Sequence, residues 1–152
     1  MSTLSITKTE NLRLTSLGSL DANLKTIGDG IPGFIDHIPG KIFLKERLGL
    51  TGMEVSVNAM LPGEGIDFLH KHRENEELFF ILKGQGQLMV DGQVYELRES
   101  DAFRIAPDGA RAIRNPYQEA LVFLVVQAKT NAMSGWTESD GIPLQEPLIW
   151  PH

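Results

Sequence analysis

The sequence has 152 residues, of which 41% are hydrophobic and 22% are charged, and its net charge is −6. This length suits one domain that buries roughly 70% of its unfolded surface. The acidic balance argues against a nucleic-acid or anionic-membrane surface. Without cysteine, the chain has no disulfides and no thiolate chemistry. No apolar run approaches the ~20 residues of a transmembrane helix, and residues 1–10 do not resemble a secretory signal, so we expect a cytoplasmic protein.

Residues 1–40 mix polar and apolar positions, with three glycines between Gly28 and Gly33. The apolar residues of this stretch follow neither a helical nor a strand periodicity, and we expect it to form an N-terminal extension. Such a segment is expected to pack on the main domain, which we place at residues 41–130, or on a partner chain. For the first dozen residues, disorder is an equally good interpretation.

Short apolar segments separated by turn residues fill the middle of the chain. The turn signals are Pro62-Gly63, Lys83-Gly84, Asp91-Gly92, Asp108-Gly109 and Asn115-Pro116. Their regular spacing indicates an all-β sandwich or barrel. We predict strands over residues 53–61, 77–82, 86–90, 93–97, 102–106, 111–115 and 121–127. Asp91-Gly92 predicts a type I′ hairpin, and the nearly apolar last strand is expected to be buried on both faces.

Side-chain roles in these strands can also be predicted. Four phenylalanines are expected in the core, whereas two arginines alternate with apolar neighbours and are expected on an outer face. These residues are Phe79, Phe80, Phe103 and Phe123 for the core, and Arg104 and Arg114 for the outer face. The polar run Glu74-Asn75-Glu76 is expected to be a solvated turn.

Residues 131–152 carry two Trp and three Pro with little periodicity, and we expect a C-terminal extension. Both extensions contain apolar residues that need a cover, and these include Phe34, Ile35, Leu148, Ile149 and Trp150. Because exposed apolar clusters usually mark an interface, we expect a homodimer.

The stretch from His70 to Gly84 holds the residues that point to chemistry. In an extended segment, His70 and His72 point to one face with Cα atoms about 6.6 Å apart, so two imidazoles can converge on one ion. After a turn, Glu77 opens the next strand and can bring a carboxylate to the same point. Two His and one carboxylate suit Fe(II), Mn, Ni or Zn, and three protein ligands leave positions open for water or substrate. A lone pair of histidines at this spacing would more often be surface residues.

This stretch resembles the first motif of the cupin family, G(x)5HxH(x)3–4E(x)6G. The pattern matches at His70, His72, Glu77 and Gly84, while Glu64 stands between Gly63 and Gly65 where the first glycine is expected. The second cupin motif, G(x)5PxG(x)2H(x)3N, then falls on Ser100, Ala106, Asp108, Arg111 and Asn115, with identity only at the asparagine. The resemblance covers about residues 53–127. It implies a cupin-type double-stranded β-helix, or jelly-roll barrel.

Arg111 stands where the resemblance places the fourth metal ligand, a histidine. A guanidinium has no lone pair to give and stays charged. Three interpretations follow. The metal keeps three ligands and Arg111 binds an anionic group of the substrate. Alternatively, Arg111 pairs with Glu77 and no metal binds. In the third interpretation Arg111 points outward.

The main functional hypothesis is a metal-dependent cupin that acts on a small molecule, which is anionic if Arg111 binds it. The resemblance implies dioxygenase, isomerase or decarboxylase chemistry, with a divalent ion (Fe, Mn, Ni or Zn) on His70, His72 and Glu77. The alternative is a small-ligand-binding cupin without metal or catalysis. A nucleic-acid or membrane partner is not expected.

Overall fold

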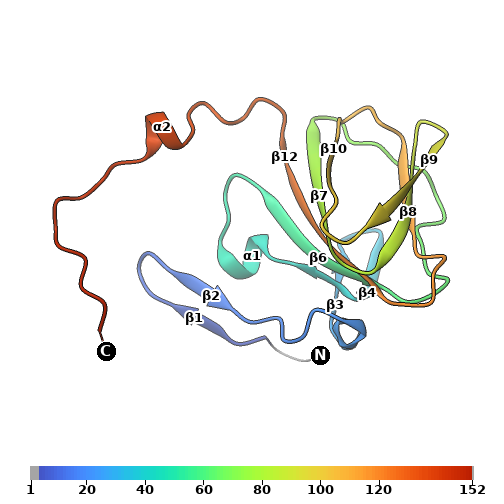
Figure 1. The fold of residues 1–152 in the computed structure, drawn as a ribbon, viewed down its shortest axis with the longest axis horizontal. Coiled ribbons are helices and arrows are strands. Elements are labelled where there is room, and N and C mark those ends of the chain that lie inside the picture. The colour runs from blue at the N-terminus through green and yellow to red at the C-terminus, as the bar shows by residue number, and fades with distance from the viewer. Residues whose placement is uncertain (1–3, 152) are drawn as a thin grey trace.

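β-Strands are the main regular element of the computed structural model, which describes residues 4–151 (Figure 1). In chain order the elements are β1 (Ile6–Lys8), β2 (Arg13–Thr15), the 3-10 helix η1 (Ala22–Thr26), β3 (Gly28–Ile31), β4 (Ile35–Pro39), β5 (Lys41–Phe43), α1 (Lys45–Leu48), β6 (Glu54–Met60), β7 (Asn75–Lys83), β8 (Gln85–Val90), β9 (Gln93–Arg98), β10 (Ala102–Ile105), β11 (Arg111–Arg114), β12 (Leu121–Lys129) and α2 (Thr137–Asp140). Among the described residues, no helix is long and apolar enough to cross a membrane.

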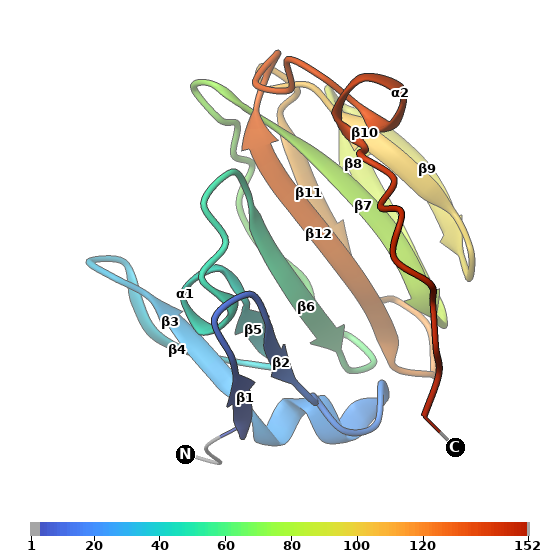
Figure 2. The same ribbon diagram turned by 90° about the vertical axis from the view of Figure 1, so that its left-hand side faces the viewer.

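Two antiparallel sheets form the barrel. The larger sheet has five strands in the order β10-β7-β12-β6-β5, and the smaller has three in the order β11-β8-β9. Figure 2 shows the larger sheet nearly face on, with β12 between β6 and β7. The predicted jelly-roll barrel is therefore confirmed.

The seven predicted strands correspond to β6 through β12. Asp91 and Gly92 have φ angles of 49° and 81°, as a type I′ turn requires, and Val90 pairs with Gln93 across a two-residue loop. The predicted turn over Glu74-Asn75-Glu76 is wrong in part. Strand β7 begins at Asn75 because β12 continues to Lys129 and pairs with it there.

A cluster of nine buried apolar residues packs between the two sheets: Phe79, Ile81, Leu88, Leu97, Ile105, Ile113, Leu121, Phe123 and Val125. Phe103 packs against this cluster. The prediction for Phe80 is wrong, since its side chain is 38% exposed. Strand side chains alternate between faces, so Phe80 must face outward when Phe79 and Ile81 face inward. Arg104 and Arg114 are exposed, as predicted.

The N-terminal segment covers part of the outer face of the larger sheet. Leu24 of η1 is 1% exposed and packs with Ile42, Val57, Ala59 and Val122. Strand β12 is thereby covered on both faces in its first half, where Leu121, Val122, Phe123 and Val125 are buried, as predicted from its apolar sequence.

The C-terminal residues leave the barrel after β12 and extend away from it (Figure 1). Their large apolar side chains are 64–83% exposed, and these are Met133, Trp136, Ile142, Leu144, Leu148, Ile149 and Trp150. This surface is the kind that a second chain would cover. The homodimer stays a prediction.

Candidate metal site and its cavity

His70 and His72 lie on an extended segment that runs beside β11. His70 and Arg111 exchange backbone hydrogen bonds, with N···O distances of 3.2 and 3.0 Å, and the His72 amide donates to the Pro107 carbonyl at 2.9 Å. The two imidazole rings are 5.6 Å apart and nearly perpendicular. The i, i+2 spacing therefore brings both rings into the same part of the barrel, as the sequence predicted.

Glu77 reaches the same point from β7. Its carboxylate is buried, and Oε1 lies 3.1 Å from His72 Nε2. One ligand atom from each of His70, His72 and Glu77 lies within 4.8 Å of the others. Ligands at right angles around an ion with bonds of about 2.1 Å would be about 3.0 Å apart, so the Glu77–His72 pair already has this spacing, and any wider pair would have to draw closer to receive an ion. The structure brings all three predicted ligands together.

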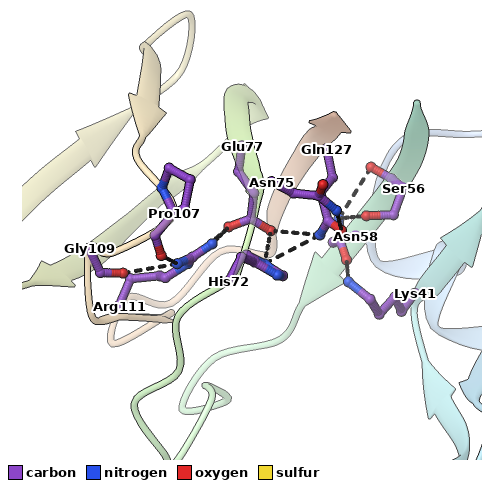
Figure 3. Close-up of polar contacts among 10 residues, drawn as sticks. All are labelled: Lys41, Ser56, Asn58, His72, Asn75, Glu77, Pro107, Gly109, Arg111 and Gln127. Carbon is purple, nitrogen blue, oxygen red and sulfur yellow. Dashed lines mark hydrogen bonds and ion pairs between the residues drawn. The ribbon is translucent and has the colours of Figure 1, made fainter. Parts of the chain in front are cut away.

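Arg111 is 1% exposed and points inward, which excludes the outward interpretation. Its Nε and Nη2 donate to Glu77 Oε2 at 3.0 and 2.6 Å, and Nη1 donates to the carbonyls of Gly109 and Pro107 at 2.9 and 3.3 Å (Figure 3). Because every guanidinium nitrogen is engaged by the protein, this geometry does not support the predicted binding of substrate by Arg111. The ion pair uses only Oε2, and Oε1 still faces His72.

The electrostatics of the cluster keep Glu77 ionised and His70 neutral. Burial by itself raises the pKa of Glu77, but the hydrogen bonds and charge of Arg111 outweigh it and hold this pKa below its ordinary value. Burial and the charge of Arg111 lower the pKa of His70. A carboxylate and a neutral imidazole are the protonation states that a metal ion requires.

His70 provides a further test of whether these residues fit a metal. Its Nδ1 is buried, and no hydrogen-bond partner for it occurs among residues 4–151. A buried ring nitrogen without a partner costs free energy in a metal-free protein. The donor set of two imidazoles and one carboxylate fits the divalent ion that the motif implies.

Gln127 is a site residue that the sequence reasoning missed. It stands opposite Glu77 in the pairing of β12 with β7, so both side chains lie on the inner face. Its Nε2 lies 3.3 Å from both Glu77 Oε1 and His72 Nε2, and its Oε1 accepts from Asn75 at 2.9 Å. The sequence did carry a signal for Gln127, because side chains alternate between the two faces of a strand. Phe123 and Val125 point inward, and Gln127 is the next residue on that face.

Lys41 was also missed. It pairs with Asn58 across β5 and β6, and its Nζ donates to Asn58 Oδ1 at 2.8 Å. Figure 3 shows a row of polar side chains that runs from Arg111 through Glu77 and Gln127 to Asn58 and Lys41. Burial lowers the pKa of Lys41, while the charges of Glu77 and Glu54 act in the opposite direction without cancelling it.

These groups line a cavity of about 720 Å³, which is within the range of small-molecule sites. Its other walls are mainly apolar and include Met60, Ile66, Phe68, Phe34 and Ile38. The rings of Phe34 and Phe68 meet edge to face at 5.8 Å. Both are partly exposed, so they stand at its mouth. The cavity can therefore hold a small molecule next to the cluster.

The barrel region of this chain is similar to known proteins. Residues 57–127 match a family model described as Cupin domain. The crystal structure of a cupin protein from Bacteroides fragilis is similar with a TM-score of 0.67 and 40% identity, over 68% of this chain and 88% of that one. A predicted oxalate decarboxylase from Thermotoga maritima is 25% identical with a TM-score of 0.51, over 56% of this chain and 73% of that one.

A curated relative is an uncharacterized protein from Methanocaldococcus jannaschii, 33% identical over 57 residues. The match spans 38% of this chain and 46% of the archaeal protein, so it covers less than half of that relative's length. The family model, the Bacteroides structure and the barrel topology agree with one another. The chain belongs to the cupin superfamily.

Proposed function

We propose that this protein is a metal-dependent cupin, with a divalent Fe, Mn, Ni or Zn ion on His70, His72 and Glu77 and a small-molecule substrate in the adjoining cavity. The observation that carries the proposal is the convergence of these three side chains within 4.8 Å at the wall of a cavity of about 720 Å³. When bound, such an ion supplies Lewis acidity, and iron or manganese also supplies redox chemistry. Dioxygenase, isomerase and decarboxylase reactions all fall within this range.

In this proposal, the chain's own groups orient the ligands. Arg111 holds Glu77 Oε2, so Oε1 is directed toward His72. The Gln127 amide reaches both Glu77 and His72 and restrains their orientation. Hydrogen bonds of this kind around metal ligands typically account for a tenfold to hundredfold effect on metal affinity. Arg111 is thus a positioning residue.

A second candidate is a small-ligand-binding cupin without metal. The ion pair between Arg111 and Glu77 favours it, since the buried carboxylate already has a charged partner. A guanidinium close to a divalent ion also repels that ion. Both candidates use the same cavity and differ in metal content.

The test is elemental analysis of protein purified without added metal, followed by titration of Fe(II), Mn(II), Ni(II) and Zn(II) into protein treated with a chelator. We expect about one equivalent in the wild type, and a loss of most bound metal in His70→Ala, His72→Ala and Glu77→Gln. His37→Ala is the matched control, because His37 is exposed and outside the cluster. If the wild type takes up none of the four ions, the metal-free candidate replaces this proposal.

A further inference from the structure

Lys41 is a cation of the cavity wall. Its ammonium donates one hydrogen bond, to Asn58 Oδ1 at 2.8 Å, and lies 5.0 Å from the centroid of the Phe43 ring. In the part of the chain that the structure describes, no carboxylate oxygen lies within 4.0 Å of Lys41 Nζ. An ammonium has three N–H groups, so Lys41 has donors left for a ligand.

The other cations along the cavity are already engaged. Arg111 is held by Glu77 and two carbonyls, as described above. Lys25 Nζ donates to Glu64 Oε2 and to the Pro39 carbonyl, both at 2.8 Å. Among the described lysines and arginines that line this space, Lys41 is therefore the one with an uncommitted charge.

The rest of the cavity decides what kind of anion would fit. Two carboxylates, Glu54 and Glu77, are close enough to act on the charge of Lys41. Arg111 balances Glu77, so the charges of Lys41, Arg111, Glu54 and Glu77 sum to zero. A monoanion at Lys41 is then repelled less by the two carboxylates than a dianion such as a phosphate monoester. The apolar walls, with the Phe34 and Phe68 rings at the mouth, favour a ligand with an apolar body.

We infer that Lys41 binds the carboxylate of a monocarboxylic acid whose apolar body fills the aromatic and aliphatic end of the cavity. The substrate role of this acid rests on the proposed function, since it names the substrate class for that same site. The geometry assigns to Lys41 the anion-binding role that the sequence had suggested for Arg111. Asn58 Oδ1 holds the ammonium in place, and Asn58 Nδ2 is directed instead to Ser56.

The experiment compares matched ligands by isothermal titration calorimetry. Phenylacetate and 4-methylpentanoate are the carboxylate probes, phenylacetamide is the neutral match, and phenyl phosphate is the dianion. They are titrated into protein treated with a chelator, and then into protein reloaded with Mn(II). Lys41→Met removes the charge, Lys41→Arg keeps it, and Lys25→Met makes the same change at a lysine whose ammonium is engaged.

In metal-free wild type, we expect at least one carboxylate probe to bind more tightly than phenylacetamide and phenyl phosphate. Lys41→Met is expected to lose about tenfold to a hundredfold in carboxylate affinity, the range for a charge-assisted hydrogen bond. Its affinity for phenylacetamide should not change. Lys41→Arg and Lys25→Met should both retain carboxylate binding, and thermal melts establish that each variant is folded.

Three results would overturn the inference. The first is equal binding of phenylacetate and phenylacetamide, or no binding of either carboxylate probe at millimolar concentration. The second is unchanged carboxylate affinity in folded Lys41→Met. The third is a preference for carboxylates that appears only after Mn(II) is added and survives Lys41→Met, because the ion would then be the anion-binding group. Since the metal-free arm does not depend on His70, His72 or Glu77 binding an ion, its outcome is independent of the metal test.

Discussion

The buried pair of Arg111 and Glu77 gives the sharpest test of the energetics of the site. The perturbation is Arg111→Met, which leaves the Glu77 carboxylate buried without its cation. Removing one partner of a buried ion pair typically costs about 3–5 kcal/mol. In a domain of this size, 1 kcal/mol corresponds to roughly 2–4 °C in melting temperature, so we expect a decrease of about 6–20 °C. Arg114→Met is the control, because Arg114 is exposed on the same strand and should cost less than about 0.5 kcal/mol.

The assay is urea unfolding in the presence of a chelator, for Arg111→Met, Glu77→Gln and the double variant. Because the two side chains share their hydrogen bonds, the double variant should lose about 0.5–3 kcal/mol less than the sum of the single variants. A divalent ion would supply the missing positive charge near Glu77. Its addition should therefore stabilise Arg111→Met more than it stabilises the wild type.

The same pair makes stability depend on pH. The guanidinium holds the pKa of Glu77 below its ordinary value, so the pair stabilises the fold fully above about pH 4.3. Its contribution is lost as the pH falls through the lowered pKa of the folded state. The stability difference between wild type and Arg111→Met should thus shrink in acid. A cost below about 1 kcal/mol at neutral pH, or an equal loss for Arg114→Met, would refute the reasoning.

Three further predictions concern other parts of the molecule. Burial raises the pKa of Glu64, but the hydrogen bonds from Lys25 and the Leu61 amide outweigh it. Glu64→Gln should therefore lower the urea midpoint at neutral pH, and this difference should be lost as the pH falls from about 4.3 through the lowered pKa of folded Glu64. Gly84 has a φ of 79°, and a Cβ there would lie 2.3 Å from the Ala120 carbonyl oxygen. Gly84→Ala should therefore lower the free energy of unfolding by about 1–3 kcal/mol or more, which a thermal melt followed by circular dichroism would measure. Light scattering should give twice the chain mass of 16.8 kDa, and deletion of residues 133–152 should give the monomer; a full-length monomer would contradict the predicted dimer.

The barrel could be predicted from the sequence because its signals are local. A type I′ turn needs residues that tolerate positive φ, and Asp91-Gly92 supplies them. Alternating or fully apolar runs between such turns predict strands within a few residues. The i, i+2 spacing of His70 and His72 is local in the same sense, since the pleat of an extended segment alone directs both side chains to one face. The turn before Glu77 was harder to predict, because the start of β7 depends on how far β12 extends beside it.

The identity of each partner in the site was decided by the tertiary structure. Arg111 and Glu77 are 34 positions apart, and three interpretations of Arg111 were equally compatible with the sequence. Only the approach of β11 to β7 selects the ion pair. Lys41 meets Asn58 through the register of β5 on β6, and Gln127 meets Glu77 through that of β12 on β7. Register between distant strands depends on packing of the whole barrel and has no signature within a single segment. That is the physical reason why the sequence located the candidate metal ligands, while the structure determined which cation holds the Glu77 carboxylate.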